Sequence, residues 1–441
     1  MRLTLLFILL CAGIIGQGQE IKPAAYLFSG EIADSDLLPV QKAWEYSFIG
    51  EYQLALRAYE LEPDTREKAG EMQGNLKDEE YSFFSSFSPY NAKAYILDRS
   101  RRERILMINE AHNNSRHRVF VQDLLGGLYQ NGYRYLGLEG LSPNFSDSLT
   151  LGSDTLLNKR GYPLNSQYTG YYTREPQFAN LIRVAIEMGF TVVAYERTPF
   201  QDMERDSAQA LHVMRILQED PGAKILLYCG YAHLVESIRE RREENYGKTK
   251  WLGAIIQELS GINPLTINQE VLTERLKTPN SPYFSLIDAG TSAVLLNDKN
   301  VPFNGPKGFD KYDLLVYHPP TQYVAGRPDW LYRDSTYQSF QVPEELLEKL
   351  SCPCLVKAYR KKEQPNSVPV DIIELTGKVT DQKALVLPPG SYRLEIIDNK
   401  EKKEYLITIV KLNSTKPLNQ STSPLRHNYY LHRRYSRSSV G

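Results

Sequence analysis

Long apolar runs are scarce in this chain of 441 residues, and the one at 3–15 stands at its N-terminus. No later segment reaches the roughly 18 to 20 apolar residues that a membrane-spanning helix needs, so we expect no membrane span. Arg2 precedes this run, and small residues at Gly16 and Gly18 follow it, as is typical of a secretory signal. We therefore predict that 1–18 is a signal peptide and that the protein is exported, to the periplasm or the extracellular space.

Cysteine is also rare. Cys11 lies in the apolar run and raises a lipoprotein alternative, but the two residues before it are leucines, where a lipid-attachment signal has small residues. Beyond the signal the sequence keeps only Cys229, Cys352 and Cys354. An odd number of cysteines in an oxidising compartment implies no disulfide framework.

An excess of charge of either sign is absent, because 52 Lys and Arg stand against 53 Asp and Glu. This balance argues against nucleic acid as a partner and leaves a small molecule or a peptide as the substrate. Tyrosine, in contrast, is frequent, with 30 residues. In an exported protein it is typical of surfaces that bind carbohydrate, haem or peptides, or it is a compositional habit of the organism.

Composition and periodicity divide the chain into four parts after the signal. Apolar residues at three- and four-residue spacing predict a helical cap within 19–90. Strands that alternate with helices over 91–340 predict an α/β domain, with a mainly parallel sheet flanked by helices. Short alternating strands over 341–412 predict a small all-β, sandwich-like accessory domain, and the polar composition of 413–441 predicts a disordered tail.

The central part carries the clearest alternation. We expect strands at 92–98, 104–109, 135–138, 191–195 and 224–229, with a last strand in YDLLVYHPP at 312–320. We expect helices at 116–129, 175–188 and 202–218, and another that begins near Ala232. The stretch 142–173 has no clear periodicity and follows a strand end, which is typical of a lid or a specificity loop.

Four of the apolar runs end in an acid or a histidine. Because the carboxyl ends of parallel strands meet at one edge of a sheet, we expect these side chains to share one crevice. They are Glu110, His112, Glu139, Glu196 and His233. Glu196, Arg197 and His318 are secondary candidates: Glu196 and Arg197 form either part of the site or only a salt bridge at the sheet edge, and His318 stands at a further strand end.

Two of these ends share a pattern, because Asn109–His112 (NEAH) and Gly230–His233 (GYAH) each place a histidine three positions after a turn-forming residue. Glu139 follows the strand between them, and Arg205 opens the helix before the second motif. This set resembles the superfamily that groups erythromycin esterases, TIKI-type metalloproteases, TraB-like proteins and ChaN-like haem-binding proteins. The resemblance covers about 92–318, and Asn109 departs from the glycine of its first motif.

The resemblance implies an active centre made of His112, Glu139 and His233, with Arg205 as the arginine that these families place ahead of the second motif. Two mechanisms suit such a set. In one, the two histidines and the glutamate hold zinc, manganese or iron with an open position for water. In the other no metal takes part: His112 is a general base, Glu110 or Glu139 orients it, and Arg205 or His233 stabilises the oxyanion.

We therefore predict an exported hydrolase of an ester, amide or peptide bond, either a metal-dependent peptidase or an enzyme similar to erythromycin esterase. The alternative is a ChaN-like protein that binds haem or an iron complex without turnover, with tyrosines of 162–172 at the ligand. A third reading is a surface-interaction protein without activity. A single histidine at a strand end is usually a hydrogen-bonded loop residue, so the prediction depends on the matched pair of motifs.

Overall fold

The computed structural model describes residues 23–62, 76–143, 152–198, 203–237, 239–240, 248–277, 280–309, 311–334, 336–348, 350–377, 383–398, 402–409 and 429–433. The predicted signal peptide at 1–18, with Cys11, lies outside these residues. Among the described residues no helix combines the length and the apolar character needed to cross a membrane.

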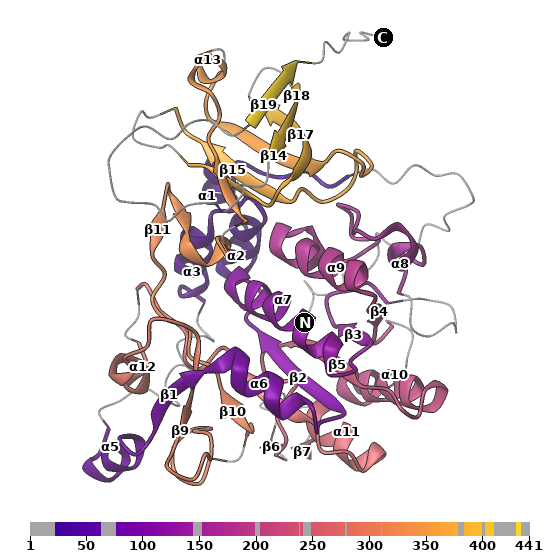
Figure 1. Ribbon diagram of the computed structural model, residues 1–441, viewed down its shortest axis with the longest axis vertical. Coiled ribbons are helices and arrows are strands. Elements are labelled where there is room, and N and C mark those ends of the chain that lie inside the picture. The colour runs from indigo at the N-terminus through magenta and orange to yellow at the C-terminus, as the bar shows by residue number, and fades with distance from the viewer. Residues whose placement is uncertain are drawn as a thin grey trace, which may run out of the picture.

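A six-stranded parallel sheet forms the centre of the molecule (Figure 1). Its strands, in spatial order, are β10 (Leu314–Leu315), β8 (Leu265–Asn268), β2 (Ile105–Glu110), β5 (Ile225–Gly230), β3 (Tyr135–Leu138) and β4 (Thr191–Ala194). Every neighbouring pair is parallel. The α/β class that the alternating sequence predicted is confirmed.

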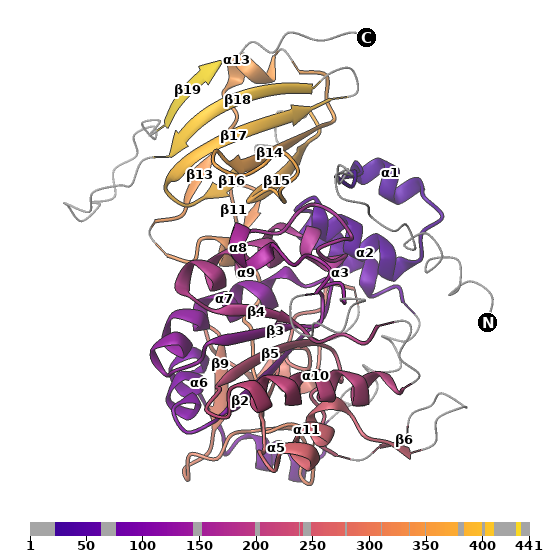
Figure 2. The same ribbon diagram turned by 90° about the vertical axis from the view of Figure 1, so that its right-hand side faces the viewer.

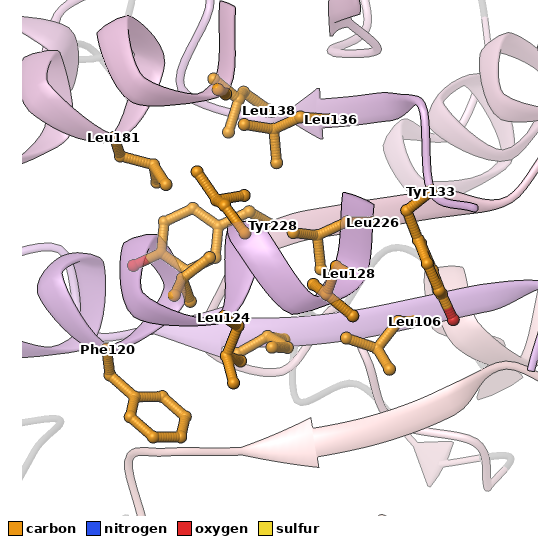
Figure 3. Close-up of a cluster of buried hydrophobic side chains, with 14 of the residues drawn as sticks. Leu106, Phe120, Leu124, Leu128, Tyr133, Leu136, Leu138, Leu181, Leu226 and Tyr228 are labelled. Atoms are coloured by element: carbon orange, nitrogen blue, oxygen red, sulfur yellow. The ribbon is translucent and has the colours of Figure 1, made fainter. Parts of the chain in front are cut away.

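Helices cover both faces of this sheet because its strands are apolar on both sides. On one face lie α6 (Ala92–Ser100), α7 (Ser115–Gln130) and α9 (Pro176–Met188), and on the other α10 (Arg205–Glu219) and α11 (Leu252–Ser260). Side chains alternate along β5, so Leu226 and Tyr228 join the first cluster, whereas Leu227 joins the second. Figure 3 shows Leu124 and Leu128 of α7 in the first cluster with these strand residues.

Two sequence predictions in this part are wrong. Residues 92–98, expected as a strand, form α6, because Ala92 and Ile96 are buried at helical spacing and the Asn91 side chain caps the first turn by accepting the Ala94 N–H. No helix begins near Ala232, since 231–234 is a turn and the next described helix, α11, begins at Leu252. The expected last strand is short, with only β10 at the edge of the sheet.

The C-terminal part forms two small antiparallel sheets. The larger has the order β15 (Asp371–Leu375), β14 (Cys354–Arg360), β17 (Gly390–Ile397), β18 (Lys402–Ile409) and β19 (Tyr429–Arg433). The smaller pairs β13 (Gln338–Phe340) with β16 (Leu385–Leu387), and Phe340 and Leu385 share an apolar cluster with Val356 of the larger. Strand β19 comes from the segment expected to be a disordered tail, so that expectation does not hold for these five residues.

Short elements connect these layers. The helices among them are α5 (Asp78–Phe84), α8 (Leu157–Arg160), α12 (Pro282–Leu286), α13 (Glu344–Leu347), η1 (Tyr172–Arg174) and η2 (Asp329–Leu331). The strands are β1 (Ser88–Asn91), β6 (Arg239–Glu240), β7 (Lys248–Thr249), β9 (Ala293–Leu296), β11 (Tyr323–Val324) and β12 (Arg327–Pro328).

The N-terminal helices α1 (Ser29–Asp34), α2 (Pro39–Phe48) and α3 (Tyr52–Tyr59) lie against the C-terminal sheet and the α/β part (Figure 2). Ile32 and Ala55 of these helices share an apolar cluster with Leu355 and Ile372 of β14 and β15. Gly50 between α2 and α3 has φ 75°, and a side chain there would collide with the Ile372 carbonyl oxygen. We call α1 to α3 the cap, and its contacts reach both other parts of the molecule.

Candidate active site

The carboxyl ends of four neighbouring strands bring the polar residues of the motifs to one edge of the sheet. Glu110 ends β2 in register with Gly230 at the end of β5, and Glu139 and Glu196 follow β3 and β4. The turn after β5 carries His233, and its Tyr231 has φ 45°, in the left-handed region. Non-glycine residues rarely adopt this conformation outside functional or tightly constrained turns.

Asn109 and Gly230, which begin the two motifs, have different structural tasks. The Asn109 side chain donates to the Tyr231 carbonyl at 2.8 Å and accepts the Gln269 N–H at 2.8 Å, so it joins the ends of β2, β5 and β8. A glycine at position 109 would lose both bonds, so the asparagine has a structural task that a glycine there could not perform. Gly230 is required by close approach, because a Cβ there would lie 2.6 Å from His112 Nε2 and 3.3 Å from Glu139 Oε2.

Glu110 and His112 form a buried carboxylate–imidazole dyad. The Nδ1 atom of His112 lies 2.7 Å from Glu110 Oε1. Arg118 of α7 donates to Glu110 through Nε at 2.7 Å and Nη2 at 2.9 Å, and the Tyr228 hydroxyl donates at 2.7 Å. Burial raises the pKa of Glu110, but Arg118 outweighs it and holds this pKa well below its usual range. Because an ionised carboxylate only accepts, His112 Nδ1 must donate, and the neutral ring keeps its lone pair on Nε2.

The His112 ring is fixed by two tyrosines. Tyr172 stacks on it with ring centroids 4.1 Å apart, and Tyr231 meets it edge-on at 5.0 Å. The distances from the Gly230 position place His112 Nε2 and Glu139 Oε2 on the same side of the β5 turn. The unprotonated nitrogen therefore points to the group of residues around Glu139.

His233 forms a second dyad. Its Nδ1 is hydrogen-bonded to the buried carboxylate of Asp206, in the first turn of α10. Its Nε2 lies 3.1 Å from Arg205 Nη1 and 3.4 Å from Glu139 Oε1. A neutral ring accepts from the guanidinium, whereas a protonated ring donates to Glu139. Burial lowers the pKa of His233, but Glu139 and Asp206 raise it more, so the net shift is upward and favours the protonated form.

Arg205 and Glu139 connect the two dyads. The Glu139 carboxylate accepts the Gly230 N–H through Oε2 and the Arg205 guanidinium through Oε1. Burial raises the pKa of Glu139, but His233 and Arg205 bring it below its usual value. Arg205 also pairs with Glu196, with Nε 3.0 Å from Oε1, and Gln209 donates to Glu196 at 3.0 Å. The Arg205 side chain is 42% exposed, more than those of Glu139, Glu196, His112 and His233, so it is the most solvent-accessible of these five side chains.

Of the three secondary candidates, Arg197 and His318 direct their side chains to other parts of the fold. Arg197 donates through Nη1 to the Met203 carbonyl at 2.9 Å and so braces its own loop. His318 is buried, with Nδ1 2.8 Å from Ser292 Oγ and Nε2 3.0 Å from Gln269 Oε1. Burial holds the pKa of His318 well below its usual value, so the ring is a neutral hydrogen-bonding group. Glu196, in contrast, contacts the site through Arg205.

Several residues of the site were not among the sequence candidates. They are Arg118, Glu175, Tyr228 and Tyr52, whereas Tyr172 was expected only as a contact of a bound haem. Asp206, which follows Arg205 in the sequence and hydrogen-bonds to His233, also belongs to the site. No local signal in the sequence singles out Arg118, because Glu110 lies eight positions earlier and outside helix α7.

The side chains do not fit the predicted metal site. Both Glu139 oxygens and His233 Nε2 face hydrogen-bond donors, and the Arg205 guanidinium contacts Glu139 Oε1 and His233 Nε2 together. A cation is thus already in place where zinc, manganese or iron would have to bind. Across the described ranges, no group of three His, Cys, Asp or Glu side chains is arranged to hold a metal ion. The expected ligand set of His112, Glu139 and His233 is therefore not supported.

No protein-family model matches the chain, and no curated protein matches it. Among solved structures it is similar to the type III effector HopBA1, with 11% identity, 53% of this chain and 96% of that chain covered, and a TM-score of 0.33. It is also similar to RRSP, a MARTX toxin effector domain from Vibrio vulnificus (24% identity, 37% and 33% covered, TM-score 0.25). A third is ChaN of Campylobacter jejuni, which binds haem cofacially (10% identity, 52% and 92% covered, TM-score 0.30).

ChaN is also one of the groups that the two motifs resemble, and the relation of this chain to each of those groups remains a prediction. Similarities of this strength assign no activity to the chain.

Proposed function

We propose that the protein is a hydrolase of an ester, amide or peptide bond that works without a metal, with His112 as the general base. The observation that carries this proposal is the Glu110–His112 contact of 2.7 Å, with Glu110 held by Arg118. This arrangement leaves Nε2 as the proton acceptor and gives the resulting imidazolium a buried anion as partner. The finer assignment to an ester, amide or peptide follows from the motif resemblance.

Each step uses a residue of the site. His112 Nε2 takes a proton from a water molecule as the water oxygen attacks the substrate carbonyl carbon. The carbonyl oxygen becomes an oxyanion, which the exposed Arg205 guanidinium stabilises together with the protonated His233. His112 then gives its proton to the leaving oxygen or nitrogen as the bond to carbon breaks. Glu139 and Glu196 hold Arg205 in place through both steps.

Haem capture is the second candidate, and the contacts of the tyrosines do not favour it. The Tyr162 hydroxyl accepts the Gln364 N–H at 3.1 Å, and the Tyr171 hydroxyl donates to Glu45 at 3.0 Å. The Tyr172 ring covers one face of His112. These tyrosines, expected at a haem ligand, are occupied within the protein. Export through 1–18 stays a prediction.

The test compares the wild-type chain with His112→Asn on activated esters, arylamides and a peptide library. As matched control we choose His212→Asn, because His212 is buried on α10 and its Nδ1 hydrogen-bonds to the Tyr195 carbonyl, which an asparagine amide can also reach. We expect hydrolysis by the wild type and the control and a loss of at least a hundredfold in His112→Asn. Stoichiometric haem binding, followed by visible absorbance, without hydrolysis of any substrate would overturn the proposal.

A further inference from the structure

Arg118 holds a second carboxylate besides Glu110. Its Nη1 donates to Glu175 Oε2 at 3.0 Å, and neither side chain is exposed. Glu175 precedes α9, and the same Oε2 accepts the Phe178 N–H at 2.7 Å, which caps that helix. Two buried anions therefore share one arginine cation, so how strongly Glu175 attracts Arg118 affects how firmly Arg118 holds Glu110.

The remaining oxygen of Glu175 is bound from the cap. The Tyr52 hydroxyl, in the first turn of α3, donates to Glu175 Oε1 at 3.3 Å. The Tyr52 ring lies 5.0 Å from the ring of Trp330, and the Arg327 guanidinium lies 5.5 Å from its centroid. Tyr52 is thus in contact with a segment of the chain about 275 residues away in sequence.

Arg327 continues this set of contacts into the C-terminal sheet. Its Nη2 donates to Asp371 Oδ1 at 2.6 Å, and its Nη1 donates to the Gly50 carbonyl at 3.2 Å. Asp371 Oδ2 accepts the Val386 N–H at 2.8 Å. The six buried side chains that run from the C-terminal sheet to the dyad are Asp371, Arg327, Tyr52, Glu175, Arg118 and Glu110. Their charges alternate in sign, with the neutral Tyr52 hydroxyl between the cap and the α/β part.

Burial makes each of these contacts matter. An ionised group out of water is costly unless hydrogen bonds and an opposite charge satisfy it. If the Tyr52 hydroxyl is removed, Glu175 Oε1 loses its donor. The Glu175 carboxylate is then less satisfied, attracts the Arg118 guanidinium more strongly and draws it away from Glu110. Glu110 is then less neutralised, and its pull on the Nδ1 proton of His112 grows.

We propose that Tyr52 is a positioning residue of the active site: its hydroxyl satisfies Glu175 so that Arg118 stays on Glu110 and the Glu110–His112 dyad keeps its geometry. The cap and the C-terminal sheet, which fixes Arg327 beneath Tyr52, are therefore part of what builds the site. The catalytic consequence rests on the proposed hydrolase function, whereas the effect on the dyad does not.

The experiment compares Tyr52→Phe with Tyr133→Phe. Tyr133 is a matched control because its buried hydroxyl donates to the Ser100 and Glu103 carbonyls near the amino end of β2, at the opposite end of that strand from Glu110 (Figure 3 shows its ring at the edge of the core cluster). The dyad is followed by ¹⁵N NMR of the His112 ring as a function of pH. The charged and titratable groups around this ring are Glu110 at Nδ1, Glu139 near Nε2, and Tyr172 and Tyr231 against the ring, while Arg118 contacts Glu110 and the His112 carbonyl.

For Tyr52→Phe we expect the titration midpoint of His112 to rise. The rise should correspond to a roughly three- to tenfold higher proton affinity, because the lost hydrogen bond to charged Glu175 acts on His112 only through Arg118 and Glu110 and passes on part of its energy. On a substrate found in the activity screen, kcat falls by up to about tenfold, KM is unchanged, and the acid limb of the pH profile moves to higher pH. Tyr133→Phe leaves all three as in the wild type.

A second variant is expected to shift the His112 midpoint in the opposite direction. A folding defect would not produce shifts of opposite direction in the two variants. Glu175→Gln keeps an oxygen for the Phe178 N–H and for Arg118 Nη1 but removes the negative charge that competes with Glu110 for Arg118, so the His112 midpoint falls instead of rising. In the double variant, Tyr52→Phe has no further effect, because its target charge is gone. An unchanged midpoint in a folded Tyr52→Phe protein, or a midpoint in Glu175→Gln that does not fall, overturns the inference. If no variant or wild type hydrolyses anything, the proposed function fails while the NMR result still decides the role of Tyr52.

Discussion

Replacing Glu110 with glutamine tests the dyad most directly, because the two side chains differ by a single atom and by one charge. Arg118 Nε and the Tyr228 hydroxyl both donate to Glu110 Oε2. In Glu110→Gln these two donors favour the amide oxygen at that position over the single Arg118 Nη2 donor at Oε1, and the amide NH2 then faces His112 Nδ1. The amide donates where the carboxylate accepted, so the neutral His112 ring must carry its proton on Nε2 and no longer offers a lone pair to water.

An imidazole locked in the wrong tautomer loses most of its power as a general base, and we expect kcat to fall by roughly 10³- to 10⁴-fold, or about 4 to 5.5 kcal/mol of barrier. KM should change little, because Glu110 is buried and lies behind the ring. The assay is steady-state hydrolysis at neutral pH, with circular dichroism to show that the variant is folded. A fall of less than threefold in a folded variant would refute the role of the dyad.

Stability provides an independent readout of the same substitution. The pKa of Glu110 is lower in the folded protein than in the unfolded chain, so its charge stabilises the fold above about pH 4.3 and this contribution is lost as the pH falls below that value. The wild type should therefore lose on the order of 2 to 3 kcal/mol more stability than Glu110→Gln between pH 5 and pH 2.

Glu363→Gln is the matched control for this substitution. Glu363 binds Arg183 through two hydrogen bonds of 2.8 and 2.7 Å, a buried Arg–Glu pair like that of Glu110 but joining α9 to the C-terminal part. Breaking the Glu363–Arg183 ion pair should lower the free energy of unfolding and leave kcat unchanged. Equal loss of kcat in the two variants would mean that the effect on activity is a general consequence of breaking a buried ion pair.

Three further outcomes are expected. Chelators should leave hydrolysis unchanged, and metal analysis of the purified protein should give less than one equivalent, because Arg205 occupies the place between Glu139 and His233. Arg205→Lys should lower kcat by about 10²- to 10³-fold, since an ammonium cannot contact Glu139, Glu196 and the oxyanion together, and Arg197→Lys should not. The raised pKa of His233 means that its positive charge stabilises the fold fully below about pH 6.5 and that this contribution is lost as the pH rises through the folded pKa. Because Asp206 helps to raise this pKa, Asp206→Asn should move the alkaline limit of activity to lower pH.

The parallel sheet was predictable because strand periodicity and helix spacing are local signals. The gathering of Glu110, Glu139 and His233 at one edge followed from the rule that parallel strands end together. The strand prediction for 92–98 failed because a run of seven residues with two buried positions, Ala92 and Ile96, fits a strand or a helix. The contact that decides between them is a single one, from the Ala94 N–H to the Asn91 side chain.

The supporting network was beyond such rules. Tyr52 and Glu175 are 123 positions apart, and Arg327 and Asp371 belong to different parts of the chain. Charged residues are most often exposed, so a sequence alone assigns them to the surface, and only their mutual contacts make burial affordable. For the same reason, the spacing of His112, Glu139 and His233 in the sequence favoured neither the metal-dependent nor the metal-free mechanism.

The choice between the two mechanisms turns on Arg205. Two imidazoles and a carboxylate on adjacent strand ends are equally suited to a divalent ion or to proton transfer, but a metal needs the lone pairs of Glu139 and His233 at the same point. The guanidinium is already bound there, and Glu196 anchors it from the other side. An arginine stays charged at any pH at which the protein is folded. The site therefore has a permanent electrophile beside a base whose tautomer is fixed, and polarising a carbonyl needs no ion to be loaded first.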